Sequence, residues 1–123
     1  MNVSGFTQQQ LETLLDLLVL GMYVDGKLAS CEEARVKELI TAMGGTEEYD
    51  RNRVFDGAVN RVRRYSETRE SARGYAARLA AGFTEREQKM RVFDLLNDLL
   101  SADGEVTAEE NKFLAAISEV FRG

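Results

Sequence analysis

An internal repeat that spans most of the chain is the feature that most restricts its fold. The sequence VDGKLASCE at residues 24–32 returns as ADGEVTAEE at residues 102–110, an offset of 78 residues (103 − 25). The same offset pairs Leu17 with Leu95, Leu18 with Leu96, Asp25 with Asp103, Gly26 with Gly104, Leu28 with Val106, Glu32 with Glu110 and Leu39 with Ile117. Each copy places an apolar segment before the Asp-Gly pair and a Glu after it. The repeat therefore predicts two helical hairpins of one design.

Length and composition indicate one globular domain, which we place at residues 1–123. The chain is 44% hydrophobic and 30% charged, which is ordinary for a packed protein, and it contains no Pro that would mark a rigid linker. It also contains no His, which removes the commonest general base and the commonest nitrogen ligand for metals. This composition excludes hydrolase triads that depend on His and His-rich zinc sites.

The compartment is predicted from three further features. Cys31 is the single cysteine and cannot form an internal disulfide, and the first ten residues, MNVSGFTQQQ, lack the basic and apolar regions of a signal peptide. The longest apolar run, residues 17–24, is far shorter than the roughly 20 residues that span a bilayer. We therefore expect a cytoplasmic protein without a transmembrane segment.

Apolar residues recur every three to four positions, which predicts six helices and no strand. The expected helices run from Thr7 to Val24, from Ser30 to Gly44, from after Thr46 to Tyr65, over Ala72 to Gly82, from Thr84 to Asp103, and from Thr107 onward. Helix-starting capping boxes are predicted for Thr7 with Gln10, Ser30 with Glu33, Thr84 with Glu87 and Thr107 with Glu110. The expected fold is an all-α compact bundle of six or seven helices, with two pseudo-symmetric hairpins around a central helix pair.

Charge is unevenly distributed along the chain. Residues 51–91 contain 11 of the 16 Lys and Arg and 5 of the 21 acids, a balance of 11 − 5 = +6, whereas the remainder carries 5 − 16 = −11. The Arg-rich middle (residues 51–91) either forms solvated helix faces that neutralise neighbouring helices or contacts an anionic surface. The pI near 4.8 argues against a general nucleic-acid binder.

The two Asp-Gly pairs allow two interpretations. In the first they are structural: Asp-Gly makes a tight connection, and Glu32 and Glu110 cap the helices that follow. In the second they bind a cation, because Asp25 and Asp103 would close helix C-termini, where the macrodipole disfavours an anion. Oxygen ligands without His select hard ions such as Ca²⁺, Mg²⁺ or Mn²⁺. For the second copy the candidate ligands also include Asp98 and Glu109.

An ordinary EF-hand is excluded by the same residues. DGEVTAEE overlays the second half of the calcium loop, with Asp103 at position 5 and Glu110 at position 12. Position 1 would be Leu99 or Gly21, neither of which offers a charged oxygen. Any cation site here is of another kind.

ADGEVTAEE in the second copy, with VDGKL in the first, resembles the TerB-like (tellurite-resistance) family over nearly the whole chain. The resemblance implies a pseudo-two-fold helical domain, found alone or joined to other modules, including a membrane-anchored J-domain co-chaperone, and associated with tellurite resistance and chemical or phage stress. It also implies that the paired acidic turns, here Asp25, Glu32, Asp103 and Glu110, chelate metal or dock partners at the inner face of the membrane. Because Ala29 replaces Thr107, we expect the first cap to slip to Ser30 and Glu32 to shift by one position.

The expected function is a non-enzymatic stress-response module, monomeric or weakly dimeric, that binds a protein partner and a divalent cation at the acidic turns. Two alternatives remain open: a metal-assisted hydrolase using the Asp and Glu clusters, and a sensor of lipid or nucleic-acid surfaces using Arg61 and Arg64. A redox role for Cys31 at the start of a helix is a further hypothesis, which unchanged tellurite survival with Cys31→Ser would end.

Overall fold

The computed structural model describes residues 5–24, 30–44, 47–101 and 108–122. These residues form six helices: α1 (Gln8–Val24), α2 (Ser30–Ala42), α3 (Glu48–Tyr65), α4 (Arg69–Ala80), α5 (Arg86–Leu100) and α6 (Ala108–Arg122). No strand occurs within the described ranges. The predicted all-α bundle is confirmed, and the described residues form six helices. None of the described helices combines the length and apolarity needed to cross a membrane.

The helices repeat with the offset found in the sequence. α1 and α5 begin 78 residues apart (86 − 8), and α2 and α6 begin 78 residues apart as well (108 − 30). The equivalent side chains Gln10 and Gln88 exchange two hydrogen bonds: Gln10 Nε2 donates to Gln88 Oε1 at 3.2 Å, and Gln88 Nε2 donates to Gln10 Oε1 at 3.1 Å. A reciprocal bond between equivalent residues is what a local two-fold axis produces. The pseudo-symmetric hairpins α1–α2 and α5–α6 therefore meet at this pair.

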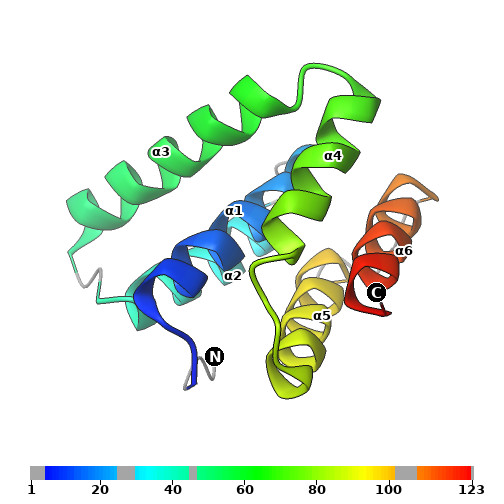
Figure 1. Cartoon of the computed structure of the whole chain (residues 1–123). Helices are drawn as coiled ribbons and strands as arrows, with labels where there is room; N and C mark the ends of the chain where they lie inside the picture. The colour runs from blue at the N-terminus through cyan, green and yellow to red at the C-terminus, as the bar shows by residue number, and fades with distance from the viewer. Residues whose placement is uncertain (1–4, 25–29, 45–46, 102–107, 123) are drawn as a thin grey trace.

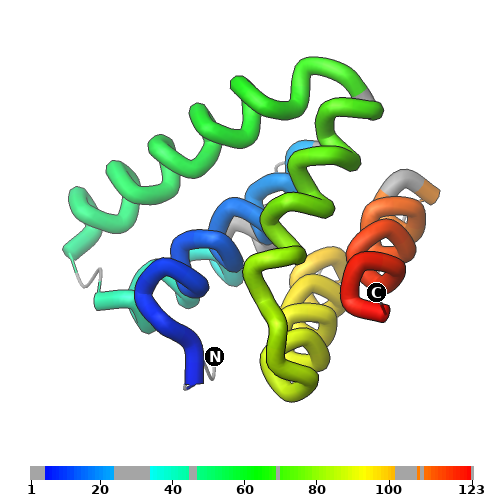
Figure 2. Tube along the Cα trace, viewed as in Figure 1, coloured from blue at the N-terminus to red at the C-terminus, as the bar shows by residue number. Residues whose placement is uncertain are grey.

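α1 is the central element of the bundle, since it packs against each of the other five helices. Figure 1 shows α3 and α6 on opposite sides of α1, with α4 crossing between them. The tube in Figure 2 shows α5 and α6 side by side, and these two helices pack directly against each other. The predicted central helix is therefore confirmed.

The core is built from the apolar stripes of all six helices. Its fully or nearly fully buried residues are Leu11, Leu14, Leu15, Leu17, Leu18, Val19, Leu20, Met22, Val36, Leu39, Ile40, Ala58, Val62, Tyr75, Ala76, Ala80, Phe83, Val92, Leu96, Leu99, Leu100, Phe113, Leu114 and Ile117. Burying one Leu-sized side chain contributes roughly 1.5 to 3 kcal/mol, so eight such residues on α1 make it the main source of stability. Tyr65, predicted on the apolar stripe of α3, is 43% exposed and packs against the Tyr75 ring in a tilted arrangement, with centroids 5.0 Å apart.

Two glycines are required by the geometry around them. A Cβ on Gly21 would lie 3.2 Å from the ring of Phe113 and 3.3 Å from Leu100, so the absence of a side chain lets α5 and α6 approach α1. Gly44 follows the end of α2 with φ of +107°, a backbone angle that L side chains rarely adopt. The predicted stop at Gly44 is confirmed.

The helix starts follow the predicted capping residues in one case and depart from them in another. Thr7 N donates to Gln10 Oε1 at 3.0 Å and Gln10 N donates to Thr7 Oγ1 at 3.1 Å, which confirms the first capping box. The box predicted at Thr84 and Glu87 is wrong, because the N-cap of α5 is Glu85 and its side chain caps nothing.

The side chain in the N3 position of α5, Gln88, turns inward instead and bonds Gln10 and the carbonyl of Gly5. A capping box that the sequence analysis did not identify begins α4, where Thr68 and Ser71 satisfy each other's backbone N–H groups. The Ser30 and Thr107 boxes rest on side chains outside those described.

Candidate functional site: the acidic turns

The structure describes only part of the predicted site. Asp25 and Asp103 lie outside the described residues, as does the side chain of Cys31. Glu32 is the third residue of α2 and Glu110 is the third residue of α6. The expected shift of Glu32 by one position is therefore wrong: α2 begins at Ser30 itself, and the two Glu residues occupy equivalent positions in their first turns. The first turn of a helix favours a carboxylate through the helix dipole.

Glu110 is the best-defined member of the site. Its side chain is buried, with the residue only 1% exposed, and it follows residues 102–107, which include Asp103, after two intervening residues. An ionised carboxylate away from water is stable only where donors or cations surround it. Glu110 is therefore a buried acid that needs donors or a cation around it, and not a solvated surface acid.

Asp98, a candidate ligand for the second turn, is engaged by another residue. Arg35 Nη1 of α2 lies 3.3 Å from Asp98 Oδ2 of α5, and both side chains are about half exposed. This ion pair links the two hairpins and neutralises the charge that a cation would need. Within residues 5–24, 30–44, 47–101 and 108–122, no three Cys, Asp or Glu side chains gather in a group that could hold a metal ion. A cation site at the second turn would consequently need ligands from residues 102–107.

A second buried acid, Asp16, was missed by the sequence analysis. It lies on α1, is 7% exposed, and accepts two hydrogen bonds from Arg61 of α3: from Nε at 3.1 Å and from Nη2 at 2.8 Å. The hydroxyl of Tyr75 on α4 donates to Asp16 Oδ2 at 3.2 Å. A lone acid inside the apolar run LLDLLVL was the available signal, because a charge on a buried face requires a partner.

The electrostatics of this network follow from its burial. Loss of solvation, together with the negative charge of Asp16, raises the pKa of Tyr75 to about 12. The hydrogen bonds to Asp16 raise the pKa of Arg61. Asp16 has a guanidinium and a phenol as partners, so it serves as a structural anchor between α1, α3 and α4 rather than as a general base.

The Arg-rich middle is in part explained by this anchor. Arg61 neutralises a neighbouring helix, as one of the two interpretations of that region proposed. Arg78 similarly covers the Tyr65 ring, with its guanidinium carbon 5.8 Å from the ring centroid. Arg63 and Arg64 remain exposed on α3. Arg61, one of the two residues proposed for an anionic-surface sensor, is therefore already paired with Asp16.

Comparisons with known proteins agree with the architecture. The family model described as "Tellurite resistance protein TerB" matches residues 11–122, from the first buried residue of α1 to the end of α6. No curated protein and no solved structure gives a match. Since the family model covers nearly the whole chain, including both acidic turns and all six helices, this protein belongs to the TerB family of tellurite resistance proteins.

Proposed function

We propose that this chain is a non-enzymatic stress-response module that binds a divalent cation at its acidic turns and docks a protein partner there. Membership of the TerB family supports a role of the tellurite-resistance type. The observation that carries the cation site is the burial of Glu110 in the first turn of α6, seven residues after Asp103 in the sequence. Oxygen ligands from Asp103 and Glu110 favour Ca²⁺, Mg²⁺ or Mn²⁺.

The repeat supports a second, weaker site of the same kind. Glu32 has the same helix position as Glu110, and Asp25 the same sequence position as Asp103. Lys27 replaces Glu105, which lowers the negative charge of the first copy. We expect the second turn to bind the cation more tightly than the first.

The proposed place of action is the cytoplasm, with the partner in solution or at the inner face of the membrane. A cation that holds an acidic turn in one arrangement would also fix the surface that the partner contacts, so partner binding would depend on the ion. The chain alone is expected to be a monomer or a weak dimer.

The test is a titration of ¹⁵N-labelled protein with Ca²⁺, Mg²⁺ and trace Mn²⁺, following the amides of Gly26 and Gly104. We expect saturable shifts or selective broadening, larger at Gly104. Asp103→Asn and Glu110→Gln should weaken the response at Gly104 at least about tenfold, which corresponds to the loss of a charged ligand. Asp56→Asn, an exposed acid on α3, is the matched control and should leave it unchanged.

No response at millimolar ion would refute cation binding and leave the turns as structural connections with a docking role only. Hydrolysis of generic phosphoester or peptide substrates that is lost in Asp103→Asn would refute the non-enzymatic assignment. Salt-sensitive binding to anionic vesicles that is lost in Arg63→Ala with Arg64→Ala would instead support the surface-sensor alternative.

A further inference from the structure

The start of α5 and the end of α6 enclose a groove of about 350 Å³, which we call the open groove. Its main lining residues are Arg86, Lys89, Met90 and Phe93 of α5 with Phe121 and Arg122 of α6. The groove lies at the end of the hairpin opposite the acidic turn, where Figure 1 shows the C-terminal end of α6 beside the start of α5.

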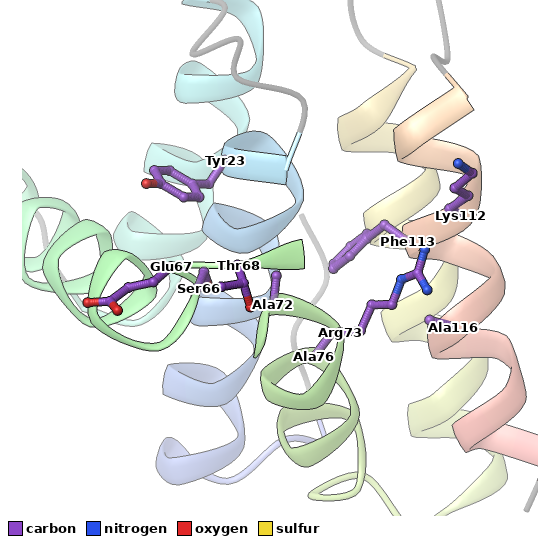
Figure 3. Close-up of a pocket in the computed structure, with 10 residues that line it drawn as sticks. All are labelled: Tyr23, Ser66, Glu67, Thr68, Ala72, Arg73, Ala76, Lys112, Phe113 and Ala116. Atoms are coloured by element: carbon purple, nitrogen blue, oxygen red, sulfur yellow. The ribbon is translucent and has the colours of Figure 1, made fainter. Parts of the chain in front are cut away.

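A different face of α6 is already covered by α4. The two helices pack directly against each other. In Figure 3, Phe113 of α6 points into the space between them, and Arg73 of α4 extends toward α6. The open groove is therefore the part of α6 that faces α5 and solvent rather than α4.

The repeat gives the open groove a counterpart on the first hairpin. Six of its lining positions are 86, 90, 93, 94, 118 and 121, and subtracting 78 gives positions 8, 12, 15, 16, 40 and 43. All six of those residues line one cavity between α1, α2 and α3, which we call the covered groove. Its facing wall is α3, through Arg53, Val54, Gly57 and Arg61. The first hairpin therefore seats a helix where the second hairpin has an open groove.

Burial differs between the two grooves as this arrangement requires. α3 packs on α1, α2 and α4 but on neither α5 nor α6. Leu15, in the covered groove, is 1% exposed, whereas its equivalent Phe93 is only partly buried. Met90 is 58% exposed, and Phe121 is also only partly buried. Three large apolar side chains thus remain accessible in one groove, and such a patch marks an interaction surface.

The covered groove pairs acids with arginines. Glu12 and Asp16 of α1 line it, and α3 supplies Arg53 and Arg61 on the facing wall. Arg61 donates hydrogen bonds to both carboxylate oxygens of Asp16. The charge of α3 therefore complements the charge of the groove that it covers.

The open groove has the reverse charge. Arg86, Lys89 and Arg122 outnumber Asp94, which gives 3 − 1 = +2. Arg86 is the first residue of α5, where the helix dipole disfavours a cation, so its charge does not stabilise its own helix. Lys89 Nζ donates to the carbonyl oxygen of Phe121 at 3.3 Å. Arg86 and Arg122 form no ion pair with any residue in the described ranges.

This charge decides which kind of helix would fit the open groove. An acidic helix would place carboxylates beside the two arginines. The α3 of a second copy would be repelled, because it carries five Arg and three acids, 5 − 3 = +2. A concave groove between two helices also fits a helix more closely than it fits the flat surface of a bilayer.

We propose that the open groove docks an acidic amphipathic helix of a partner protein, in the position that α3 takes on α1 and α2. Apolar residues of the partner at the i, i+3, i+4 and i+7 spacing contact Met90, Phe93 and Phe121, and its Asp or Glu residues pair with Arg86 and Arg122. The open groove lies apart from the acidic turns, and its docking role does not depend on the cation site.

The probe is a capped peptide of about 16 residues made of Leu, Ala and Glu, with its leucines in one helical stripe and its glutamates on both sides. ¹³C-labelled methionine methyl groups report where it binds, because Met90 lies in the open groove and Met43 in the covered groove. We expect a saturable shift of the Met90 signal and unchanged signals from Met43 and the buried Met22.

Two control peptides separate charge from shape. One has Lys in place of Glu, and the other has the same composition in an order that breaks the leucine stripe. Each should bind at least about tenfold more weakly than the acidic peptide.

Charge-reversed variants test the pairing through the fluorescence anisotropy of labelled peptides. Arg86→Glu with Arg122→Glu should weaken binding of the acidic peptide at least about tenfold and strengthen binding of the Lys peptide. Both side chains are exposed, so the helical circular dichroism should be unchanged. Arg63→Glu with Arg64→Glu, on exposed positions of α3, changes the net charge equally and should bind as the unaltered protein does. Met90→Gln should weaken binding about fivefold without changing charge.

Three results would each overturn the docking role: no saturable shift of Met90, an equal shift of Met43, or equal binding by the two charge-reversed double variants. Binding to phosphatidylglycerol vesicles that is lost in Arg86→Glu with Arg122→Glu, without binding of the peptide, would also overturn it and assign the groove to a lipid surface. Asp103→Asn should bind the peptide normally, so failure of the cation site and failure of the docking groove are distinguishable.

Discussion

The two hairpins share a sequence design but occupy different places in the molecule. In α1–α2, the first helix contacts every other helix and buries residues on nearly all of its surface, including Asp16. In α5–α6, the first helix buries only one face, and the equivalent of Asp16, Asp94, is exposed. The second helices are more alike, since Leu39 and Ile117 are both fully buried.

This difference shows that the repeat determines where the helices lie in the sequence, but not how deeply equivalent side chains are buried or what they contact. α3 and α4 lie between the two copies in sequence; α3 packs on α1 and α2 of the first hairpin, whereas α4 packs on α1 and on α6. Their Arg61 and Tyr75 supply the partners that let Asp16 be buried. Among the described residues no such partner contacts Asp94, so the same position in the repeat is an anchor in one copy and a surface acid in the other.

The largest expected difference concerns the equivalent leucines Leu17 and Leu95. Leu17 is completely buried, whereas Leu95 is only partly buried. Leu17→Ala should cost about 2 to 5 kcal/mol in the free energy of unfolding, and Leu95→Ala less than half as much, because the cavity it leaves is open to water. Urea unfolding of both variants measures this. Equal costs would show that the copies are energetically equivalent despite their burial.

Asp16→Asn should have the next largest effect. It removes the negative charge that Arg61 and Tyr75 share, and we expect a loss of about 2 to 3 kcal/mol, at the lower end for a broken buried pair because Arg61 is half exposed. Asp94→Asn is the matched control in the other hairpin, with a change within about 0.5 kcal/mol. An unchanged free energy of unfolding in Asp16→Asn would show that Asp16 does not anchor the three helices.

The Asp16 network should also give the fold a pH dependence in the alkaline range. Burial raises the pKa of Tyr75 from 10.0 to about 12, so the unfolded chain loses this proton first as pH rises. The stability is fully present below pH 10 and falls by roughly 2 kcal/mol as pH rises from about 10 to 12. Unfolding free energies across this range measure the slope. Tyr75→Phe should show a smaller slope, and an unchanged slope would contradict the assignment.

The smallest expected effect is at the ion pair between the hairpins. Arg35 and Asp98 are both about half exposed, so a double-mutant cycle of Arg35→Ala and Asp98→Ala should give a coupling free energy below about 1 kcal/mol, reduced further by salt. A larger, salt-insensitive coupling would mean that the two copies are joined by this contact rather than by the Gln10 and Gln88 amides.

Much of the fold could be predicted from the sequence, because local rules decide it. The spacing of Leu14, Leu18 and Met22 identified the buried face of α1, and Thr7 with Gln10 identified its start. The offset of 78 residues aligned the helix starts correctly. Family membership followed from the same residues, since the repeated Asp-Gly motif lies in segments that the family model covers.

The tertiary structure alone decided which polar residues are buried and what they contact. Asp16 lies 45 residues from Arg61 and 59 from Tyr75, and no local pattern could pair them. Similarly, Gln88 bonds Gln10 of the other hairpin, 78 residues away in the sequence. Helical periodicity acts between neighbours a few residues apart, so it determined the elements and their apolar faces. The partners of a buried charge are set by how whole helices pack, which is why the sequence could place Asp16 on a helix but could not find its partners.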